Sequence, residues 1–295
     1  MSLEKVELCP ICTGKSFTPF LVCKDYTTTG ELFHVEQCIN CGLLLTNPRP
    51  QHNLLGKYYQ SKSYISHTSA ANGIIDYIYL IFRKLTIRWK FKLIKPSLTF
   101  NKLLDVGCGT GHFLHHCKQA GVDAYGVEPS AEARHVASKQ NLDVVETIQA
   151  LPAVKFDVIT LWHVLEHIYD LKKTIEHLKE RLEENGIIFI AVPNWQSFDA
   201  SHYKTYWAGY DVPRHAWHFS KATMQLLIHA CGLKLKGTLP MKLDAYYVSL
   251  LSEKYSLKGN LNLLQALHAV TIGFQSNRKG KHDMNYSSLI YLVQK

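Results

Sequence analysis

Residues 103–111 read LLDVGCGTG, and this stretch decides the fold. Its apolar beginning predicts a buried strand that ends near Val106, and its glycines predict a tight loop before a helix. The spacing is G-x-G-x-G with Asp105 just before it, whereas the dinucleotide-binding fingerprint is G-x-G-x-x-G. Because glycines let the backbone approach a ligand and a helix start offers free N–H groups, the stretch predicts a nucleoside-type ligand.

Short apolar segments alternate with amphipathic ones from residue 102 onward. They predict strands over residues 102–106, 124–127, 143–145, 156–161, 186–192, 233–239 and 288–293, and helices over residues 112–120, 131–140, 171–183 and 221–230. Strands that are apolar nearly throughout and separated by helices indicate a parallel sheet covered on both faces.

A second acid, Glu128, follows the expected strand over residues 124–127, roughly 20 residues after Asp105. Its carboxylate can accept hydrogen bonds from both hydroxyls of a ribose, which is the role of an acid at this place in nucleoside-binding sheets. Asp105 at the end of its own strand suits a ligand with a positive ammonium group. Together the two acids favour a charged nucleoside over a dinucleotide.

These residues resemble the class I S-adenosylmethionine-dependent methyltransferases. The resemblance covers about residues 100–240 and the closing strand, and its motifs are 103–111, 125–130, 156–159 with 164–167, and 186–194. It implies S-adenosyl-L-methionine as the cofactor, with the glycine loop along the methionine part, Glu128 at the ribose, and the residues after the fourth strand beside the sulfonium. The expected cofactor contacts in this core are Asp105, Gly107, Cys108, Gly109, Gly111, Glu128, Pro129, Thr147, Ile148, Trp162 and His163.

Four of the eight cysteines form two C-x-x-C pairs, Cys9 with Cys12 and Cys38 with Cys41. Two such pairs can place four thiolates at the corners of a tetrahedron, as structural Zn²⁺ requires. With every position filled by protein, the predicted zinc stabilises the fold and takes no part in chemistry. The predicted fold class is therefore α/β, a Rossmann-like, seven-stranded, mostly parallel sheet with helices on both faces, plus a small N-terminal zinc ribbon.

Changes in composition divide the chain into three regions. Residues 1–48 form the zinc ribbon, residues 49–98 a linker with a basic amphipathic helix that serves as a lid, and residues 99–295 the methyltransferase domain, with insertions at 194–219 and 244–276. The helix expected within 74–95 has a charged face, which fits three roles: covering the active site, meeting a phosphate or a membrane surface, or facing solvent.

The stretch DVPRHAWHFS, residues 211–220, follows the fifth strand at the edge where ligands bind. A histidine there can act as a general base, because its pKa lies near neutrality. His215 is the first candidate and His218 the second; a histidine that only makes hydrogen bonds in a loop is the alternative.

A zinc ribbon before such a domain is similar to bacterial methyltransferases that include the deoxysugar C-methyltransferases. That resemblance implies a histidine in the corresponding loop, a nucleotide-linked sugar as acceptor, and help from Tyr59 and Tyr64 at the methionine end of the cofactor. The chain departs from this group by lacking a large final domain and by having Arg214 where an acid is expected beside the histidine.

Two other patterns have competing interpretations. Residues 163–167, HVLEH, match an inverted zinc-protease signature that needs both histidines on one helical face, and Glu166 with His167 also resembles a Mg²⁺-binding pair of some quinone-biosynthesis methyltransferases. The aromatic residues of the first insertion can stack a sugar or base, or form a small core. They are Trp195, Tyr203, Tyr206, Trp207, Tyr210 and Trp217.

The composition of the chain indicates which classes of partner and which location to expect. The net charge of +9 favours anionic partners, the apolar runs are too short to cross a bilayer, and the first residues lack the order of a secretion signal, so we expect a cytoplasmic protein. The predicted function is S-adenosylmethionine-dependent O- or C-methylation of a small or carrier-linked, phosphate-bearing acceptor, such as a sugar or nucleotide-sugar. The alternatives are RNA or DNA, which the few cations near the ribbon disfavour, and a quinone or lipid precursor. Peripheral membrane contact and the oligomeric state stay open.

Overall fold

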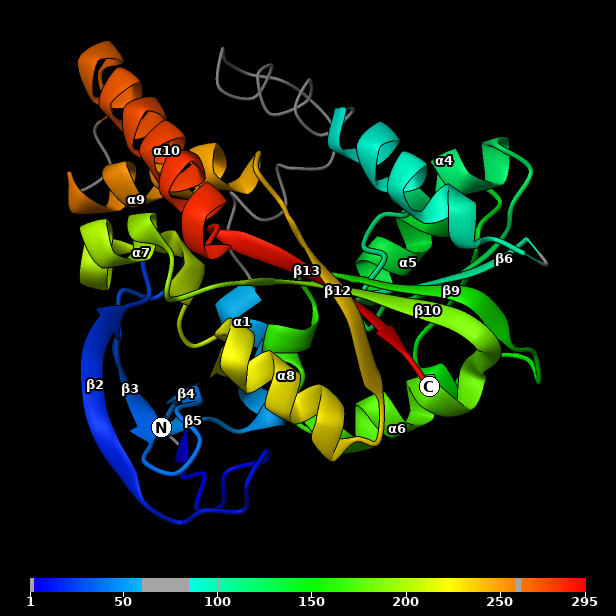
Figure 1. The fold of residues 1–295 in the computed structure, drawn as a ribbon, viewed down its shortest axis with the longest axis horizontal. Helices are drawn as coiled ribbons and strands as arrows, with labels where there is room; N and C mark the ends of the chain where they lie inside the picture. Colours follow the sequence, from blue (N-terminus) through cyan, green and yellow to red (C-terminus); the bar gives the residue numbers. More distant parts are fainter. Residues whose placement is uncertain (1–2, 60–84, 100, 258–260) are drawn as a thin grey trace.

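The computed structural model describes residues 3–59, 85–99, 101–257 and 261–295 (Figure 1). Within these residues the main feature is a seven-stranded sheet with the order β12-β13-β10-β9-β6-β7-β8. The neighbours from β10 to β8 pair in parallel, and β13 pairs antiparallel with both β10 and β12. The predicted Rossmann-like, mostly parallel sheet is confirmed.

The observed strands lie close to the predicted ones. They are β6 (Lys102–Val106), β7 (Asp123–Val127), β8 (Asp143–Val145), β9 (Phe156–Trp162), β10 (Leu182–Pro193), β12 (Lys234–Pro240) and β13 (Ser288–Gln294). Strand β10 begins earlier than predicted, because Leu182 already pairs with Phe156 before an irregularity in the register.

Helices cover both faces of this sheet (Figure 1). On one face lie α4 (His112–Gln119), α5 (Ala131–Ser138) and the helix of residues 85–94; on the other lie α6 (Leu171–Arg181) and α8 (Lys221–Ala230). Alternation of side chains along β6 explains the two cores, since Leu103 packs with α4 while Leu104 packs with α6 and α8. The part of the predicted basic helix before residue 85 lies outside the described residues.

The N-terminal region forms a small antiparallel sheet with the order β11-β4-β3-β2. Its strands are β2 (Phe17–Lys24), β3 (Leu32–Cys38), β4 (Leu44–Thr46) and β11 (Trp217–His218), and beside it β1 (Leu3–Glu4) pairs with β5 (Arg49–Pro50). Strand β11 belongs to the histidine-containing loop of residues 211–220. This loop therefore forms an edge strand of the N-terminal sheet.

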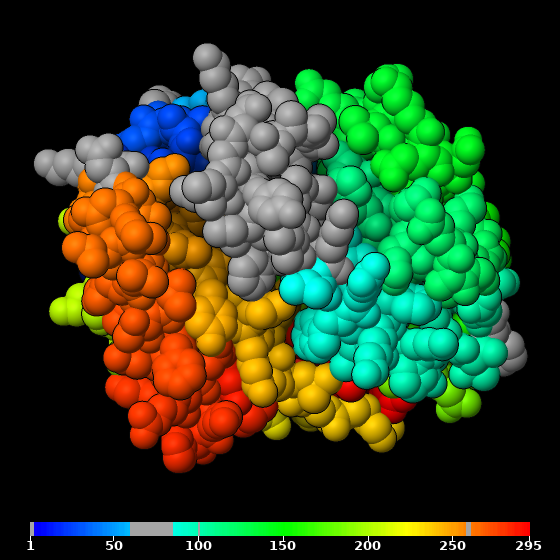
Figure 2. Space-filling model, turned by 90° about the horizontal axis from the view of Figure 1, so that it is seen from above, coloured from blue at the N-terminus to red at the C-terminus, as the bar shows by residue number. Residues whose placement is uncertain are grey.

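The remaining elements are helical. Helix α7 (Phe198–Tyr203) lies beside α9 (Asp244–Ser256) and α10 (Leu263–Asp283), and the shorter elements are η1 (His52–Leu54), α1 (Gly56–Tyr59), η2 (Lys95–Ser97), η3 (Ile148–Ala150), η4 (Leu165–His167), η5 (Lys204–Tyr206) and η6 (Ala208–Tyr210). Figure 2 shows α9 and α10 on one side of a face whose other side is the helix of residues 85–94 and α4. Among the described helices, none has both the length and the apolar character needed to cross a membrane.

Candidate active site at the carboxyl edge of the sheet

The predicted cofactor residues gather where the parallel strands end. Asp105 is the residue before the end of β6, Glu128 directly follows β7, and Trp162 ends β9. Strands β7, β6 and β9 are neighbours in the sheet, so these side chains share one edge. That edge is where open α/β sheets bind their ligands.

The three glycines of the loop have left-handed backbones for different reasons. A Cβ on Gly107 would clash with Val164, and one on Gly111 would clash with Leu142. Gly109 also has a positive φ of +55°, but a Cβ there would have nothing within 4 Å among the described atoms. Gly109 therefore borders open space, as a backbone that a cofactor approaches must do.

Glu128 has a fixed carboxylate. Its two oxygens accept hydrogen bonds from the N–H groups of Gly109 and Ser130, each at 2.9 Å. Arg134 donates to the carbonyl oxygens of Glu128 and Pro129 at 2.8 and 2.7 Å and so holds the turn after β7. The carboxylate thus connects the end of β7 to the glycine loop.

Asp105 is buried and accepts a hydrogen bond of 2.6 Å from the hydroxyl of Thr160. Burial raises the pKa of Asp105 to about 7. The ammonium of Lys90, from the helix of residues 85–94, lies 4.5 Å from the ring centre of Trp162. Burial lowers the pKa of Lys90 to about 8, although Asp244 and Asp105 oppose that shift. The buried indole N–H of Trp162 has no hydrogen-bond partner among the described atoms.

These features fit S-adenosylmethionine. The cofactor is a nucleoside with a ribose, an ammonium and a carboxylate. The edge offers an acid for the ribose, a buried acid for a cation, an unpaired indole donor, and a glycine beside open space.

His163 lies at the end of β9 with an unusual backbone. Its φ of +58° is uncommon for a residue other than glycine and marks a position under strain. Its Nε2 lies 2.7 Å from Asp244, and its Nδ1 lies 3.3 Å from Glu166. Although burial acts against it, the charge of Asp244 together with the Glu166 contact raises the pKa of His163 to about 10. His163 is therefore a cation that donates to two acids. It does not share a helical face with His167, as the zinc-protease interpretation requires.

Glu166, His167 and His215 form a compact cluster near the end of β9, called the Glu-His-His cluster below. One candidate ligand atom from each residue lies within 4.8 Å of the others. The Nδ1 of His167 lies 3.0 Å from the carbonyl oxygen of Arg214, and the Nδ1 of His215 lies 2.9 Å from that of Gly209. Since carbonyls only accept, each Nδ1 has a proton, and in the neutral form of each ring the lone pair is on Nε2.

Arg214 is buried beside the cluster and is held by two acids. Its guanidinium forms ion pairs of 3.0 Å with Asp25 and 2.6 Å with Asp211, and it donates to the carbonyl of Tyr58 at 2.8 Å. Burial acts against its charge, but the two acids outweigh burial and raise the pKa of Arg214. Two acids approach His215 in place of the neighbour that the sequence lacks: its Nε2 lies 4.0 Å from Glu166, which follows β9, and 3.9 Å from Asp211, four residues earlier in the same loop.

His218, the second candidate base, lies in β11 and packs within the small sheet. Its Nε2 is 3.2 Å from the hydroxyl of Thr46, and its ring packs edge-on against Tyr210. Burial, with the nearby His215, lowers the pKa of His218 to about 3. His218 is therefore neutral and belongs to the small sheet. His215, and not His218, is a member of the Glu-His-His cluster.

The other predicted cofactor residues are divided between two places. The hydroxyl of Tyr59 lies 3.2 Å from Nδ1 of His167, beside the Glu-His-His cluster, while Tyr64 lies outside the described residues. The thiol of Cys108 packs against Gly126 inside the domain, so its backbone is the part that lines the loop. Pro129, Thr147 and Ile148 lie just beyond β7 and β8, at the far side of the same edge.

The aromatic residues of the first insertion form a core. Tyr203, Trp207 and Tyr210 are buried in one cluster, and Trp195 packs against it, while Trp217 is buried in the core beside the large sheet. Tyr206 is the exposed member, and it lies 5.9 Å from the ring of Tyr26. The packing role explains this set better than stacking on a ligand.

The four predicted metal ligands come together. The sulfur atoms of Cys9 and Cys41 are 3.5 Å apart, as are those of Cys12 and Cys38, and all four lie within 4.8 Å of one another. Each C-x-x-C segment closes on itself, because the N–H of Thr13 donates to the carbonyl of Cys9 and that of Gly42 to Cys38. Four convergent thiols are the donor set that structural zinc prefers.

Sequence reasoning missed Lys90, Asp244 and Thr160, and it did not join Glu166 to His215. Asp244 and His163 are 81 residues apart in the chain, so no local spacing could predict their contact. Lys90 is one basic residue on a basic helix and carries no pattern of its own. The one available signal was the order of strand ends, which places Thr160 beside Asp105 once β6 and β9 are known to pair.

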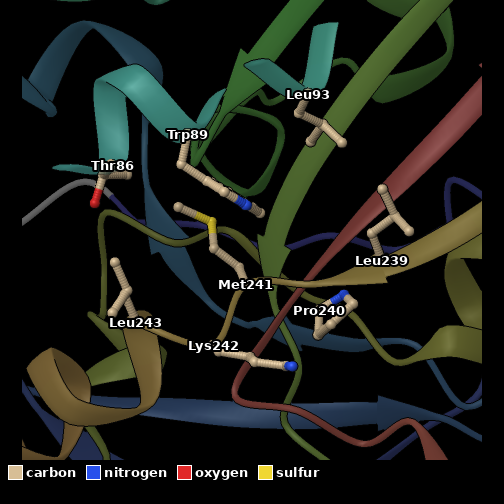
Figure 3. Close-up of a pocket in the computed structure, with 8 residues that line it drawn as sticks. All are labelled: Thr86, Trp89, Leu93, Leu239, Pro240, Met241, Lys242 and Leu243. Carbon is tan, nitrogen blue, oxygen red and sulfur yellow. The ribbon is translucent and has the colours of Figure 1, made fainter. Parts of the chain in front are cut away.

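An apolar pocket of about 340 Å³ lies between the helix of residues 85–94 and the end of β12 (Figure 3). Its lining residues are Thr86, Trp89, Leu93, Leu239, Pro240, Met241, Lys242 and Leu243. The next residue, Asp244, is the partner of His163, and Lys90 follows Trp89. The pocket is therefore lined by the chain neighbours of two charged residues at the edge of the sheet.

Comparisons with known proteins agree with this geometry. A family model described as a methyltransferase domain matches residues 66–236, more than half of the chain. Ubiquinone biosynthesis O-methyltransferases from Paraburkholderia phymatum and Pasteurella multocida are 32% and 33% identical over 118 and 117 residues, which are 37% and 33% of this chain and 51% and 48% of those proteins. The chain thus spans about half the length of the curated relatives it matches.

The fold is similar to a solved structure as well. The magnesium protoporphyrin IX methyltransferase of Synechocystis PCC 6803 matches with a TM-score of 0.51 and 14% identity, covering 64% of this chain and 92% of that one. At this identity the likeness concerns the fold alone. The matched sequence model and the shared sheet lead to one conclusion: the chain belongs to the methyltransferase-domain family, a membership that implies S-adenosylmethionine as cofactor.

Proposed function

We propose that this protein transfers a methyl group from S-adenosylmethionine to a small or carrier-linked acceptor, a sugar or nucleotide-linked sugar. The observation that supports it most is the shared edge of the large sheet. Asp105, Gly109 and Glu128 lie at the ends of β6 and β7, Glu166 and His167 follow the neighbouring strand β9, and His215 meets them from the loop of residues 211–220. The proposed cofactor site therefore lies beside the strand end that meets His215, the proposed proton acceptor.

The mechanism needs alignment and removal of a proton. S-adenosylmethionine supplies an activated methyl group when bound. Glu128 would hold the ribose, Asp105 would bind the ammonium, and Trp162 would border the sulfonium. His215 accepts the proton of an acceptor hydroxyl or of a carbon next to a carbonyl at its Nε2, and Glu166 stabilises the imidazolium that forms.

A quinone or lipid precursor is the second candidate, and the apolar pocket of Figure 3 favours it. An apolar tail in that pocket would place the head of the acceptor near Asp244 and Lys90. The sugar proposal draws on the polar Glu-His-His cluster and on the net charge of +9, which suits a phosphate-bearing carrier.

A transfer assay with the tritiated methyl donor separates the candidates. The acceptors are nucleotide sugars, polyprenylated phenols and RNA, each at several salt concentrations. Label on a nucleotide sugar supports the first proposal, whereas label only on the prenylated phenol selects the second. Label on RNA that falls steeply with salt would contradict both.

Loss of zinc from the cysteine cluster is expected to lower the rate of methyl transfer and to leave cofactor affinity close to normal. The small sheet that the cluster closes includes β11, and the hydroxyl of Thr46 donates to the carbonyl of His215 at 2.6 Å. We therefore expect Cys38→Ser to lose about one zinc equivalent per chain and most methyl transfer, while the affinity for S-adenosylhomocysteine stays close to normal.

Elemental analysis and calorimetry on the same sample check this zinc prediction. Cys231→Ser is the matched control, because Cys231 is also buried but lies at the end of α8, away from the cluster. Unchanged zinc content in Cys38→Ser would show that the four sulfurs do not form a metal site.

Cofactor affinity should increase with pH near neutrality. The pKa of Asp105 is raised to about 7 by burial, so below pH 7 the carboxyl is mostly protonated and lacks the charge that attracts an ammonium. Lys90, with its pKa lowered to about 8, acts in the same direction, since its deprotonation removes a nearby positive charge. From pH 6 to 8 we expect a gain of about tenfold, which one carboxyl titrating at neutrality produces.

Calorimetry at several pH values measures this dependence. In Asp105→Asn the affinity should be lower and nearly independent of pH between 6 and 7, where Lys90 keeps its proton. A wild-type affinity that falls as the pH rises would reverse the assigned roles of both groups.

A further inference from the structure

We propose that the Glu-His-His cluster binds a divalent transition-metal ion, with Glu166, His167 and His215 as its three protein ligands. This site is separate from the four-cysteine cluster. It rests on the proposed function only for its role, because the ion would lie where the acceptor is expected. The inference comes from the orientation of the two imidazoles, the unpaired carboxylate oxygen and the distances among the three side chains.

Both imidazole rings have the orientation and tautomer of metal ligands. In each ring the Nδ1–H donates to a backbone carbonyl, His167 to Arg214 and His215 to Gly209. Metal-bound histidines commonly use the second ring nitrogen in this way, because the hydrogen bond fixes both tautomer and ring orientation. The two Nε2 lone pairs remain free for an ion. The rings meet edge to face with their centres 4.6 Å apart, and one candidate ligand atom of each lies within 4.8 Å of the other, although the two residues belong to different loops.

The carboxylate of Glu166 is incompletely satisfied. Glu166 is fully buried, and its Oε1 lies 3.3 Å from the Nδ1 of His163. Its Oε2 is buried without a hydrogen-bond partner in the part of the chain that the structure describes. An unpaired buried carboxylate oxygen is strongly unfavourable, and a cation is the partner that removes this penalty. His163 already pairs with Oε1, and a bound ion would supply the partner that Oε2 lacks.

The separations are close to those of a site with its ion. The three candidate ligand atoms lie within 4.8 Å of one another, and the Nε2 of His215 lies 4.0 Å from Oε1 of Glu166. Ligands bound at about 2.1 Å from a common ion lie roughly 3–3.5 Å apart, so shifts on the order of 1 Å complete the geometry. Half-buried His167 leaves a side from which an ion and an acceptor oxygen can enter.

The donor set selects the class of ion. Two imidazoles with one carboxylate suit Fe²⁺, Mn²⁺, Co²⁺ or Zn²⁺ and leave open positions, whereas Mg²⁺ prefers six oxygen ligands. At an open position the acceptor's oxygen would bind, and the positive charge would lower the pKa of its hydroxyl, whose proton then leaves to water. In the metal-bound protein the ion thus takes over from the His215 imidazole as the group that promotes deprotonation.

Mn²⁺ binding to the zinc-loaded full chain tests the inference. Mn²⁺ is paramagnetic and binds thiolates more weakly than Zn²⁺ does, so the cysteine cluster keeps its zinc. We expect about one Mn²⁺ per chain by electron paramagnetic resonance, with nitrogen couplings from imidazole, and no displacement by equimolar Mg²⁺. His167→Ala and Glu166→Gln should each weaken Mn²⁺ binding by at least ~10-fold.

His229→Ala is the matched control, because His229 is an exposed imidazole on α8, and it should bind Mn²⁺ as the wild type does. Affinity for S-adenosylhomocysteine, measured on each sample, confirms that the variants are folded; if buried Glu166→Gln misfolds, half-buried His167→Ala decides. Mn²⁺ affinity that neither variant changes, or a spectrum without nitrogen coupling, overturns the site.

The same samples separate this inference from the proposed function. Histidine-dependent Mn²⁺ binding without methylation of any tested acceptor leaves the metal site standing and contradicts the proposed acceptors. Methylation without Mn²⁺ binding contradicts the metal site and leaves the proposed function, with His215 as the base.

Discussion

Replacing Glu128 by alanine is expected to weaken S-adenosylmethionine binding by roughly 10²–10³-fold, the loss of two hydrogen bonds to a charged acceptor at ~1.5–2 kcal/mol each. The carboxylate also stabilises the glycine loop, since it accepts hydrogen bonds of 2.9 Å from the N–H groups of Gly109 and Ser130. Its removal therefore loosens the glycine loop as well as the ribose contact. Calorimetry with S-adenosylmethionine and S-adenosylhomocysteine measures the loss.

Two comparisons make the result for Glu128 specific. Glu132→Ala removes an exposed acid in the first turn of α5, close in sequence, and should leave cofactor affinity unchanged. Glu128→Gln keeps the size and part of the hydrogen bonding, so its loss should be intermediate. Full affinity in Glu128→Ala would remove Glu128 from the cofactor site.

His215→Ala is expected to lower kcat by ~10²–10⁴-fold, the range of a general base, with little change in cofactor affinity. The imidazole lies beside Glu166 and Asp211, at 4.0 and 3.9 Å, and not in contact with the glycine loop. The split between turnover and cofactor binding is therefore the diagnostic feature. Single-turnover transfer of labelled methyl, with calorimetry in parallel, measures both quantities.

His218→Gln is the comparison for His215. His218 is buried in β11 beside Thr46, so its substitution should lower thermal stability and affect turnover far less. A His215→Ala enzyme that keeps full turnover would contradict its role both as a base and as a metal ligand beside the acceptor. An equal loss in both variants would instead indicate damage to the small sheet.

Local sequence patterns determined most of the large sheet. Strands β6 and β8 and helix α8 have the predicted bounds, because an apolar run or a helical period is a property of neighbouring residues. The glycine loop and the four cysteines were also predictable, since their geometry depends on spacings of two to four residues. The fold class followed from the same alternation of strands and helices.

Long-range partners decided the chemistry around His215. The sequence predicted His215, but Arg214 stands next to it where an acid was expected. In the structure Arg214 instead pairs with Asp25 and Asp211, and Glu166 supplies the acid. Asp25 and Glu166 lie far from this loop in the chain, whereas Asp211 belongs to it, and pairing of β4 with β11 fixes the loop that unites them.

The sequence by itself determined a cofactor loop, a second acid at Glu128, a cysteine quartet and the strands that carry them, because short-range spacing and periodicity encode these features. Only the tertiary structure decided that Lys90 and Asp244 reach the sheet edge, that β11 joins the N-terminal sheet, and that Glu166, His167 and His215 meet. The physical reason is that such contacts depend on the packing of whole elements, which no local pattern records.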